Sequence, residues 1–316
     1  MRNRFFQFFM VMVASAVLTS CSKDDDTTPA EQNIYQTAKT NPDLSSLVAA
    51  IDKAGLSDEL SNSASSFTVF APTNDAFSAF LSANGFSSLN DVPVDVLTSV
   101  LLNHVVDGKK MAADLTTGYV NTLATFGSTT SHLSLYVNTS AGVTLNGSSK
   151  VTAADVKASN GVVHVVDQVI GLPTVVTFAV SNPDFSTLVQ ALTRPDLSTD
   201  FVSILSGAGP FTVFAPTNAA FSALLTELGA SSLNDIDAAT LEKVLTYHVV
   251  GGNILAESLS NNQVVGTLNG DSFTIHLMSG AQIMDANDRT SNIIATDVQG
   301  SNGVVHVIDK VILPTL

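Results

Sequence analysis

The side chains of this chain that can bind metals, attack as nucleophiles or transfer protons include six histidines, one cysteine and 28 acidic residues. Their spacing matches none of the arrangements that such chemistry requires. The sequence contains no Gly-x-Ser-x-Gly turn, no His-Glu-x-x-His pair and no Gly-x-x-x-x-Gly-Lys phosphate loop. A disulfide or a Cys-rich zinc site also needs more than one thiol. We therefore expect no catalytic residues, no metal site and no cofactor, and we predict that the protein is not an enzyme.

The single cysteine, Cys21, has a distinctive sequence environment. Arg2 and Arg4 precede an apolar stretch, residues 5–18, which is shorter than the roughly 20 residues of a membrane-spanning helix and typical of a secretory signal peptide. The next residues, Leu18-Thr19-Ser20-Cys21, are similar to a bacterial lipobox, in which the cysteine receives lipid and becomes the mature N-terminus. We predict a signal peptide at residues 1–20 and lipidation of Cys21. The alternative is an ordinary signal peptide followed by an incidental cysteine.

Residues 21–33 are predicted to form a flexible acidic tether. This segment has too few apolar groups to offset the cost of ordering it. Lys23 followed by Asp24-Asp25-Asp26 resembles the signal that places some Gram-negative lipoproteins on the outer face of the outer membrane. We therefore predict an outer-membrane lipoprotein that faces outward, with its body outside the cytoplasm. A solvated spacer without an export role is the alternative.

Charge excludes some partners. The chain has 13 basic and 28 acidic residues, for a net charge of −15, so it lacks the Lys and Arg clusters with which proteins neutralise nucleic-acid phosphates. An anionic lipid surface would also repel this body. We therefore expect no nucleic-acid partner, and a membrane contact through the lipid anchor only. With 45% hydrophobic and 13% charged residues, the chain can still build folded cores.

The sequence repeats itself at the scale of a domain. FTVFAPTN occurs at residues 67–74 and again at 211–218, an offset of 144 residues. SNGVVHVVDQVI at 159–170 matches SNGVVHVIDKVI at 301–312. Solenoid repeats are only 20 to 50 residues long, so two tandem domains are the better interpretation. We place them at residues 34–171 and 175–314, separated near Gly171-Leu172-Pro173-Thr174.

Each repeat shows helical patterns first and strand patterns later. The β-rich FTVF segment ends at a proline, and apolar residues then recur at helical spacing around Phe77 and again through residues 92–106. From Tyr119 onward, β-branched and aromatic residues alternate with small polar ones. This order predicts an α+β fold in which helices cover an antiparallel β-sandwich or wedge.

These segments resemble the marker regions of fasciclin (FAS1) domains. The markers are FTVFAPTN, the His-Val-Val segment at residues 104–106 and NGVVHVVDQVI, and both copies have them in the family's order. The resemblance covers nearly all of the chain after the tether. It implies two tandem FAS1-like domains. The copies differ, because Asn103 precedes the histidine in the first copy and Tyr247 does so in the second.

The resemblance also implies binding residues. In animal members of the family, the Tyr-His neighbourhood and an Asp-aliphatic pair before the last marker are associated with integrin binding. The matching positions, which are our candidate binding residues, are His104, Asp155, Val156, Tyr247, His248, Asp297 and Val298. We expect the second copy to contribute more, because Asn103 replaces the aromatic residue in the first. The implied partner is an extracellular matrix component, a glycan or a cell-surface protein.

Each candidate also has a structural interpretation. His104 and His248 end predicted helices, where an imidazole can bind unpaired carbonyls. Asp155 and Asp297 precede turns and can accept hydrogen bonds from backbone amides. His164 and His306 alternate with valines, as expected for buried, hydrogen-bonded histidines in strands.

Three functions fit the sequence. The first is a lipid-anchored, non-catalytic adhesion protein on the cell surface. The second is a structural envelope protein that assembles with another envelope protein. The third is a carrier of a small apolar ligand, or a weak hydrolase, either of which needs a sizeable apolar pocket. The sequence leaves open the identity of the ligand, the leaflet, the oligomeric state and whether both domains bind.

Overall fold

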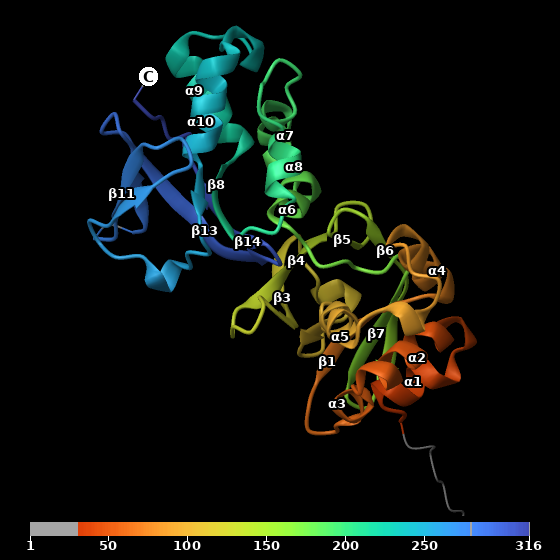
Figure 1. Cartoon of the computed structure of the whole chain (residues 1–316). Helices are drawn as coiled ribbons and strands as arrows, with labels where there is room; N and C mark the ends of the chain where they lie inside the picture. The colour runs from red at the N-terminus through yellow and green to blue at the C-terminus, as the bar shows by residue number, and fades with distance from the viewer. Residues whose placement is uncertain (1–30, 279, 316) are drawn as a thin grey trace, which may run out of the picture. The chain divides into compact units, whose positions relative to one another are not determined.

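The structure of the protein, a computed structural model, describes residues 31–278 and 280–315 (Figure 1). Residues 32–316 form one compact unit. The predicted signal peptide, Cys21 and most of the predicted tether lie outside the described residues. Two successive α+β repeats follow, as the sequence pattern predicts.

The first repeat contains five α-helices and seven strands among the described residues. The helices are α1 (Ile34–Thr40), α2 (Ser45–Ala54), α3 (Ser57–Ser61), α4 (Asn74–Ala83) and α5 (Val94–Leu102). The strands are β1 (Phe67–Pro72), β2 (Val105–Asp107), β3 (Gly118–Thr125), β4 (His132–Asn138), β5 (Thr144–Leu145), β6 (Ser149–Ala158) and β7 (Gly161–Val166).

The second repeat has the same order of elements over the residues that the structure describes. Its helices are α6 (Val175–Ser181), α7 (Ser186–Leu192), α8 (Phe201–Leu205), α9 (Asn218–Leu228) and α10 (Ala238–Tyr247). Its strands are β8 (Phe211–Pro216), β9 (Val249–Gly251), β10 (Val264–Gly266), β11 (Ser272–His276), β12 (Gln282–Met284), β13 (Thr290–Gly300) and β14 (Gly303–Ile308).

The sheet of each repeat places the first and last strands side by side. In the first repeat, the strands close into a barrel in the order β1 to β7, and β1 pairs with β7. In the second, the order is β10-β11-β12-β13-β14-β8-β9. All described strand pairs are antiparallel, as expected, except β1 with β7 and β8 with β14, which are parallel. A parallel pair needs a long connection between its strands, and here almost the whole repeat provides it.

The FTVF strands are buried on both faces. Val69 and Ala71 of β1 belong to the apolar cluster that includes helices α1 and α2, whereas Phe70 points the other way, into a cluster with Val166 and Leu135. Side chains alternate between the faces of a strand, so this continuous apolar run fills two cores at once. Strand β8 does the same in the second repeat.

The rest of the FTVFAPTN marker starts the next helix and fastens it to an earlier one. The Thr73 hydroxyl accepts from the Ala76 N–H at 3.2 Å, which caps the N-terminus of α4. The Asn74 side chain accepts from the Ser46 N–H at 2.8 Å and donates to the Pro42 carbonyl at 2.9 Å. The polar residues of this marker therefore position helices α2 and α4.

The glycine of the NGVVHV marker allows two backbones to approach closely. Gly161 has a φ of +153°, and a Cβ there would lie 2.0 Å from the Phe67 carbonyl oxygen. The preceding Asn160 accepts from the Ile34 N–H at 2.8 Å and donates to the Leu60 carbonyl at 2.9 Å. This marker thus joins β7 to β1 and to the helices.

Candidate functional site

His104 lies at the junction between helix α5 and strand β2. Its Nδ1 donates to the Val100 carbonyl at 2.7 Å, and its Nε2 accepts from the backbone N–H of Ile170 at 2.8 Å. Because Nε2 accepts a backbone hydrogen, the ring proton must be on Nδ1. The imidazole therefore binds a carbonyl at the end of the helix, which is the structural role expected from the sequence.

His248 has the same environment in the second repeat. Nδ1 lies 2.7 Å from the Val244 carbonyl oxygen, and Nε2 accepts from the Ile312 N–H at 3.2 Å. His104 is 1% exposed and His248 is 3% exposed, and burial lowers the pKa of both to about 4. Both rings are neutral at pH 7 and use both nitrogens internally. They have no free nitrogen with which to bind a ligand or activate a nucleophile.

The Tyr247 side chain is enclosed in the core of the second repeat. Its hydroxyl donates to the Ser272 carbonyl at 2.9 Å and accepts from the Ala286 N–H at 3.1 Å. Its ring meets Phe273 edge to face, with centroids 6.0 Å apart. Burial raises its pKa to about 12. Tyr247 is 0% exposed, so its aromatic ring offers no surface to a partner in this structure.

Asn103, which replaces the tyrosine in the first repeat, is also fully buried. Its amide donates to the Gly171 carbonyl at 3.0 Å and to the Ile170 carbonyl at 3.3 Å. Its carbonyl oxygen accepts from the Thr122 hydroxyl at 3.2 Å. The difference between the repeats is therefore a difference in internal packing. We expect the second repeat to contribute more to binding because it has an aromatic residue at this position. That residue, Tyr247, is buried, so it gives the second repeat no exposed aromatic group here.

Asp155 lies at a bulge of β6 and has a φ of +64°, in the left-handed region. Its carboxylate accepts from the Ala112 N–H at 2.7 Å, and its own N–H donates to Nδ1 of His164 at 3.2 Å. The other ring nitrogen of His164 donates to the Lys110 carbonyl at 2.9 Å. The bulge, the histidine and residues 110–112 thus hold one another in place.

The second repeat has the same arrangement at Asp297. This residue has a φ of +59°, its carboxylate accepts from the Ala256 N–H at 2.8 Å, and its N–H donates to His306 at 3.4 Å. His306 is stacked on Phe214 and is fully buried, and burial lowers its pKa. The structural roles expected of the two aspartates and of the strand histidines are therefore observed.

In each repeat the candidate binding residues form two groups. The Tyr-His positions are bonded to the helix end and to the chain after the last strand, whereas the Asp-Val pairs belong to the bulges of β6 and β13. Val156 is 37% exposed, while Val298 is 3% exposed. The Asp155 side chain is 39% exposed. The bulge of the first repeat therefore presents more of its Asp-Val pair to solvent. Whether any of these residues binds a partner stays a prediction.

The described residues contain neither a cluster of metal-binding side chains nor a helix suited to crossing a membrane. In residues 31–278 and 280–315, no three His, Cys, Asp or Glu side chains are grouped as metal ligands would be. Within the same part of the chain, no helix is both long enough and apolar enough to cross a membrane.

Two tandem α+β domains, with marker residues engaged in backbone contacts, define a protein built from repeated modules. The family model described as Fasciclin domain matches residues 42–173 and 183–314. The chain therefore belongs to the fasciclin family, as a tandem FAS1 protein.

Several known proteins are similar to this chain. Protein sll1483 of Synechocystis sp. is 45% identical over 143 residues, which is 45% of this chain and 74% of that protein. Cell surface glycolipoprotein MPB83 of Mycobacterium bovis is 35% identical over 145 residues, covering 44% of this chain and 60% of that protein. Transforming growth factor-beta-induced protein ig-h3 of Sus scrofa is 28% identical over 253 residues, covering 79% of this chain and 35% of that protein.

A solved structure is similar as well. It is a FAS1 domain pair from the insect cell adhesion molecule fasciclin I, with a TM-score of 0.48 and 20% sequence identity, and the match covers 89% of this chain and 95% of that one. The relatives of this chain thus include a protein named as a cell surface glycolipoprotein.

Sequence reasoning missed two features of the repeats. One is the role of Asn160 and Asn302, whose side chains fasten the marker loop to the first helix of each repeat, at Ile34 and Val175. An asparagine directly before a conformationally unusual glycine is the signal that was available. The other is a pocket in the second repeat, which no sequence motif marks.

Proposed function

We propose that this protein is a lipid-anchored adhesion protein of the cell surface that binds without catalysis. The observation that carries the proposal is the tandem pair of fasciclin domains in which His104, His248, His164 and His306 are all buried and hydrogen-bonded internally. A catalytic histidine must reach its substrate. Buried, internally hydrogen-bonded imidazoles of this kind instead stiffen a module whose function depends on its outer surface.

The proposed anchor is lipid on Cys21, and the proposed location is the outer face of the outer membrane. The support is the order of the first 26 residues: basic residues, an apolar segment, Leu18-Thr19-Ser20-Cys21 and then Lys23 with three aspartates. One relative, MPB83, is itself described as a cell surface glycolipoprotein.

The proposed binding surface includes the bulge of β6, next to Asp155 and Val156. A partner can contact Val156 and the exposed neighbouring residue Lys157 directly. On the matching strand of the second repeat, Ile294 is 56% exposed, whereas Val298 is buried. Tyr247 and His248, which are buried, would affect this function only by holding the fold. The proposed partner is a matrix component, a glycan or a protein on a neighbouring cell.

Protease treatment of intact cells tests the location and distinguishes adhesion from envelope assembly. Release of the body, residues 32–316, by protease supports the outward location, whereas protection until the outer membrane is broken favours the structural role in the envelope. A variant with Asp24, Asp25 and Asp26 replaced by serine is the matched control for the export signal. If protease releases the body of the unmodified protein but not that of this variant, the three aspartates are required for outward export.

Two further measurements test the anchor and the binding. Intact-mass analysis of membrane-extracted protein should show acyl mass on Cys21, and Cys21→Ala should leave the protein unanchored. Whole cells with and without the protein should then be compared for adhesion to immobilised matrix proteins and to a glycan array. Equal adhesion of both cell types to every surface contradicts the adhesion proposal.

A further inference from the structure

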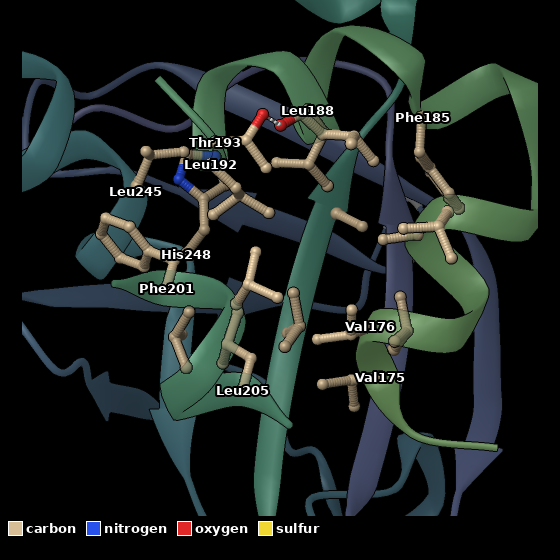
Figure 2. Close-up of a pocket in the computed structure, with 18 of the residues that line it drawn as sticks. Val175, Val176, Phe185, Leu188, Leu192, Thr193, Phe201, Leu205, Leu245 and His248 are labelled. Atoms are coloured by element: carbon tan, nitrogen blue, oxygen red, sulfur yellow. Dashed lines mark hydrogen bonds between the residues drawn. The ribbon is translucent and has the colours of Figure 1, made fainter. Parts of the chain in front are cut away.

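The core of the second repeat contains a cavity of about 200 Å³ between its first three helices and its sheet. Figure 2 shows side chains of α6, α7 and α8 around it, with β8 alongside. Protein interiors are close-packed, and voids larger than a water molecule are few. An engineered apolar cavity of about 150 Å³ is already large enough to bind benzene. A cavity of this size therefore has room for a ligand.

The repeats differ in helix length next to this cavity. In the first repeat α2 extends to Ala54 and only residues 55–56 separate it from α3. In the second repeat α7 ends at Leu192, and residues 193–200 lead to α8. Arg194 precedes Pro195, and a residue before proline disfavours the helical conformation. The second repeat therefore has a shorter helix and a longer connection beside its cavity than the first repeat has at the same place.

The same place in the first repeat is closed. There a cavity of only about 20 Å³ is lined by Leu47, Leu60, Val69 and His104, among others. Residues of the first helix also differ. Tyr35 donates to the Asp52 carboxylate at 2.8 Å, and the Lys39 ammonium lies 5.7 Å from the Tyr35 ring centroid. The positions that match Tyr35 and Lys39 in the second repeat are Val176 and Val180, which both line the larger cavity.

The lining has no charged group to hold an ionic ligand. All the described residues around the cavity are apolar except Thr193 and His248. Both nitrogens of His248 are used internally, and the Thr193 hydroxyl donates to the Val189 carbonyl at 2.8 Å. The guanidinium of nearby Arg194 is bonded to Asp196 and to the Leu233 and Ile236 carbonyls. With a net charge of −15, the chain also disfavours anions.

We propose that this cavity binds the alkyl chain of a neutral amphiphile, such as an alcohol or an ester. At roughly 30 Å³ for each water-sized group, a cavity of this volume holds on the order of seven such groups. Val180 is 63% exposed and Val202 is 40% exposed, and both line the cavity, so its apolar wall continues to the surface. The polar end of the ligand would stay in solvent at this mouth. This binding activity is separate from the proposed adhesion and does not depend on it.

Calorimetric titration with straight-chain 1-alkanols, from 1-butanol to 1-decanol, tests the proposal. The protein is the full chain carrying Cys21→Ala, which removes the predicted lipid and the need for detergent. Each added methylene should tighten binding about fourfold, the expected gain for burying one CH₂, until the chain reaches about seven carbons. Longer alkanols should then gain little. Octanoate, which is anionic, should bind at least tenfold more weakly than 1-octanol.

Two variants test whether the ligand binds in this cavity. Ala179 lines the cavity from α6, and Ala179→Leu should weaken 1-heptanol binding at least tenfold by filling the space. Ala219→Leu, at an exposed position on α9, is the matched control and should have no effect. Val180→Lys introduces at the mouth the residue type found at Lys39, at an exposed position that should not disturb folding. It should reverse the preference, so that octanoate binds better than 1-octanol.

Three results would overturn the proposal. These are the absence of measurable alkanol binding, an affinity that does not depend on chain length, and equal binding by the Ala179→Leu and Ala219→Leu proteins. If Ala179→Leu fails to fold, the Val180→Lys protein decides alone. An unchanged preference for 1-octanol in that protein contradicts binding at this mouth.

Discussion

The backbone N–H of Ile170 donates to Nε2 of His104 at 2.8 Å, although 66 residues separate the two along the chain. This bond fastens the segment after the last strand of the repeat to the end of helix α5. Ile312 and His248 form the same bond in the second repeat at 3.2 Å. The histidine of the family marker thus closes each repeat on itself, and it can do so only as an acceptor, in its neutral form.

Because these histidines are neutral in the folded protein, we predict that its stability decreases as the pH is lowered from 6.5 to about 4. Burial lowers the pKa of His104 and of His248 from 6.5 to about 4, so the unfolded chain binds protons that the folded protein excludes. The contribution of the neutral histidines to the free energy of unfolding is fully present above pH 6.5 and is lost as the pH falls toward 4. Each histidine should account for roughly 3 kcal/mol over the whole window. Urea unfolding at pH 7, 5.5 and 4.5 measures this loss.

Glutamine variants identify the groups responsible for this pH dependence. His104→Gln and His248→Gln should lower stability at pH 7 and make its dependence on pH between 6.5 and 4.5 shallower. His132→Gln, at an exposed position, should leave the stability at pH 7 unchanged. A slope that persists in the double variant of His104 and His248 assigns the dependence to other groups and contradicts the prediction.

Removing the hydroxyl of Tyr247 should destabilise the protein without a direct effect on binding. Tyr247→Phe leaves the Ser272 carbonyl and the Ala286 N–H without this partner, which should cost about 1 to 3 kcal/mol. Tyr247→Ala also removes the buried ring and should cost about 3 to 5 kcal/mol. Chemical unfolding and partner affinity should be measured on the same samples. A loss of affinity in Tyr247→Phe at unchanged stability would instead show that the hydroxyl contacts the partner.

The sequence was sufficient to predict local structure and the repeat. Thr73 caps helix α4, Phe77 of that helix packs into the core, and His164 is hydrogen-bonded in a strand. These features were predictable because each depends on nearby residue types and on periodicity. The parallel pairing of β1 with β7 could not be predicted in this way. It depends on how the two ends of a domain meet, and alternation within a strand carries no information about its neighbour.

The candidate site was harder to predict for a related reason. A Tyr-His pair has the same sequence whether its rings face solvent or the core. The burial of Tyr247 is decided by tertiary packing against Phe273 and by the positions of Ser272 and Ala286. The cavity of the second repeat was missed because it depends on how side chains from several helices and strands pack together, which no single residue type marks.

Alanine in place of the marker glycine should break the contact between the first and last strands. In Gly161→Ala, the new Cβ would lie 2.0 Å from the Phe67 carbonyl oxygen, and φ is +153°, so the backbone must move. We expect a loss of about 3 kcal/mol or more in the free energy of unfolding. Gly251→Ala is the matched control, because a Cβ there meets nothing within 4 Å. Similar losses at both glycines would contradict the close approach.

Each repeat should fold as a separate fragment, divided at Leu172. Asn103 of the first repeat holds the Gly171 carbonyl at 3.0 Å, whereas Ser301 of the second donates to the Pro173 carbonyl at 2.6 Å. Fragments 30–172 and 173–316 should each melt in one cooperative transition, followed by circular dichroism. Fragment 30–158, which lacks β7, should not. If either repeat melts cooperatively only when joined to the other, the two do not fold independently.

The last prediction separates the binding surface from the core by means of two matched valines. Val156 is 37% exposed beside Asp155, and Val298 is 3% exposed beside Asp297, so the same substitution acts on a surface in one repeat and on a core in the other. Val156→Ser should leave the melting temperature unchanged and weaken adhesion, because truncating a contact residue at an interface often costs more than about 1 kcal/mol. Val298→Ser should lower the melting temperature, because it places a hydroxyl in an apolar core and leaves a void there. Adhesion should be measured on whole cells carrying equal amounts of folded protein. If Val156→Ser leaves adhesion intact while Val298→Ser weakens it in proportion to the protein lost, the Asp-Val pairs serve the fold alone, and the partner binds another surface.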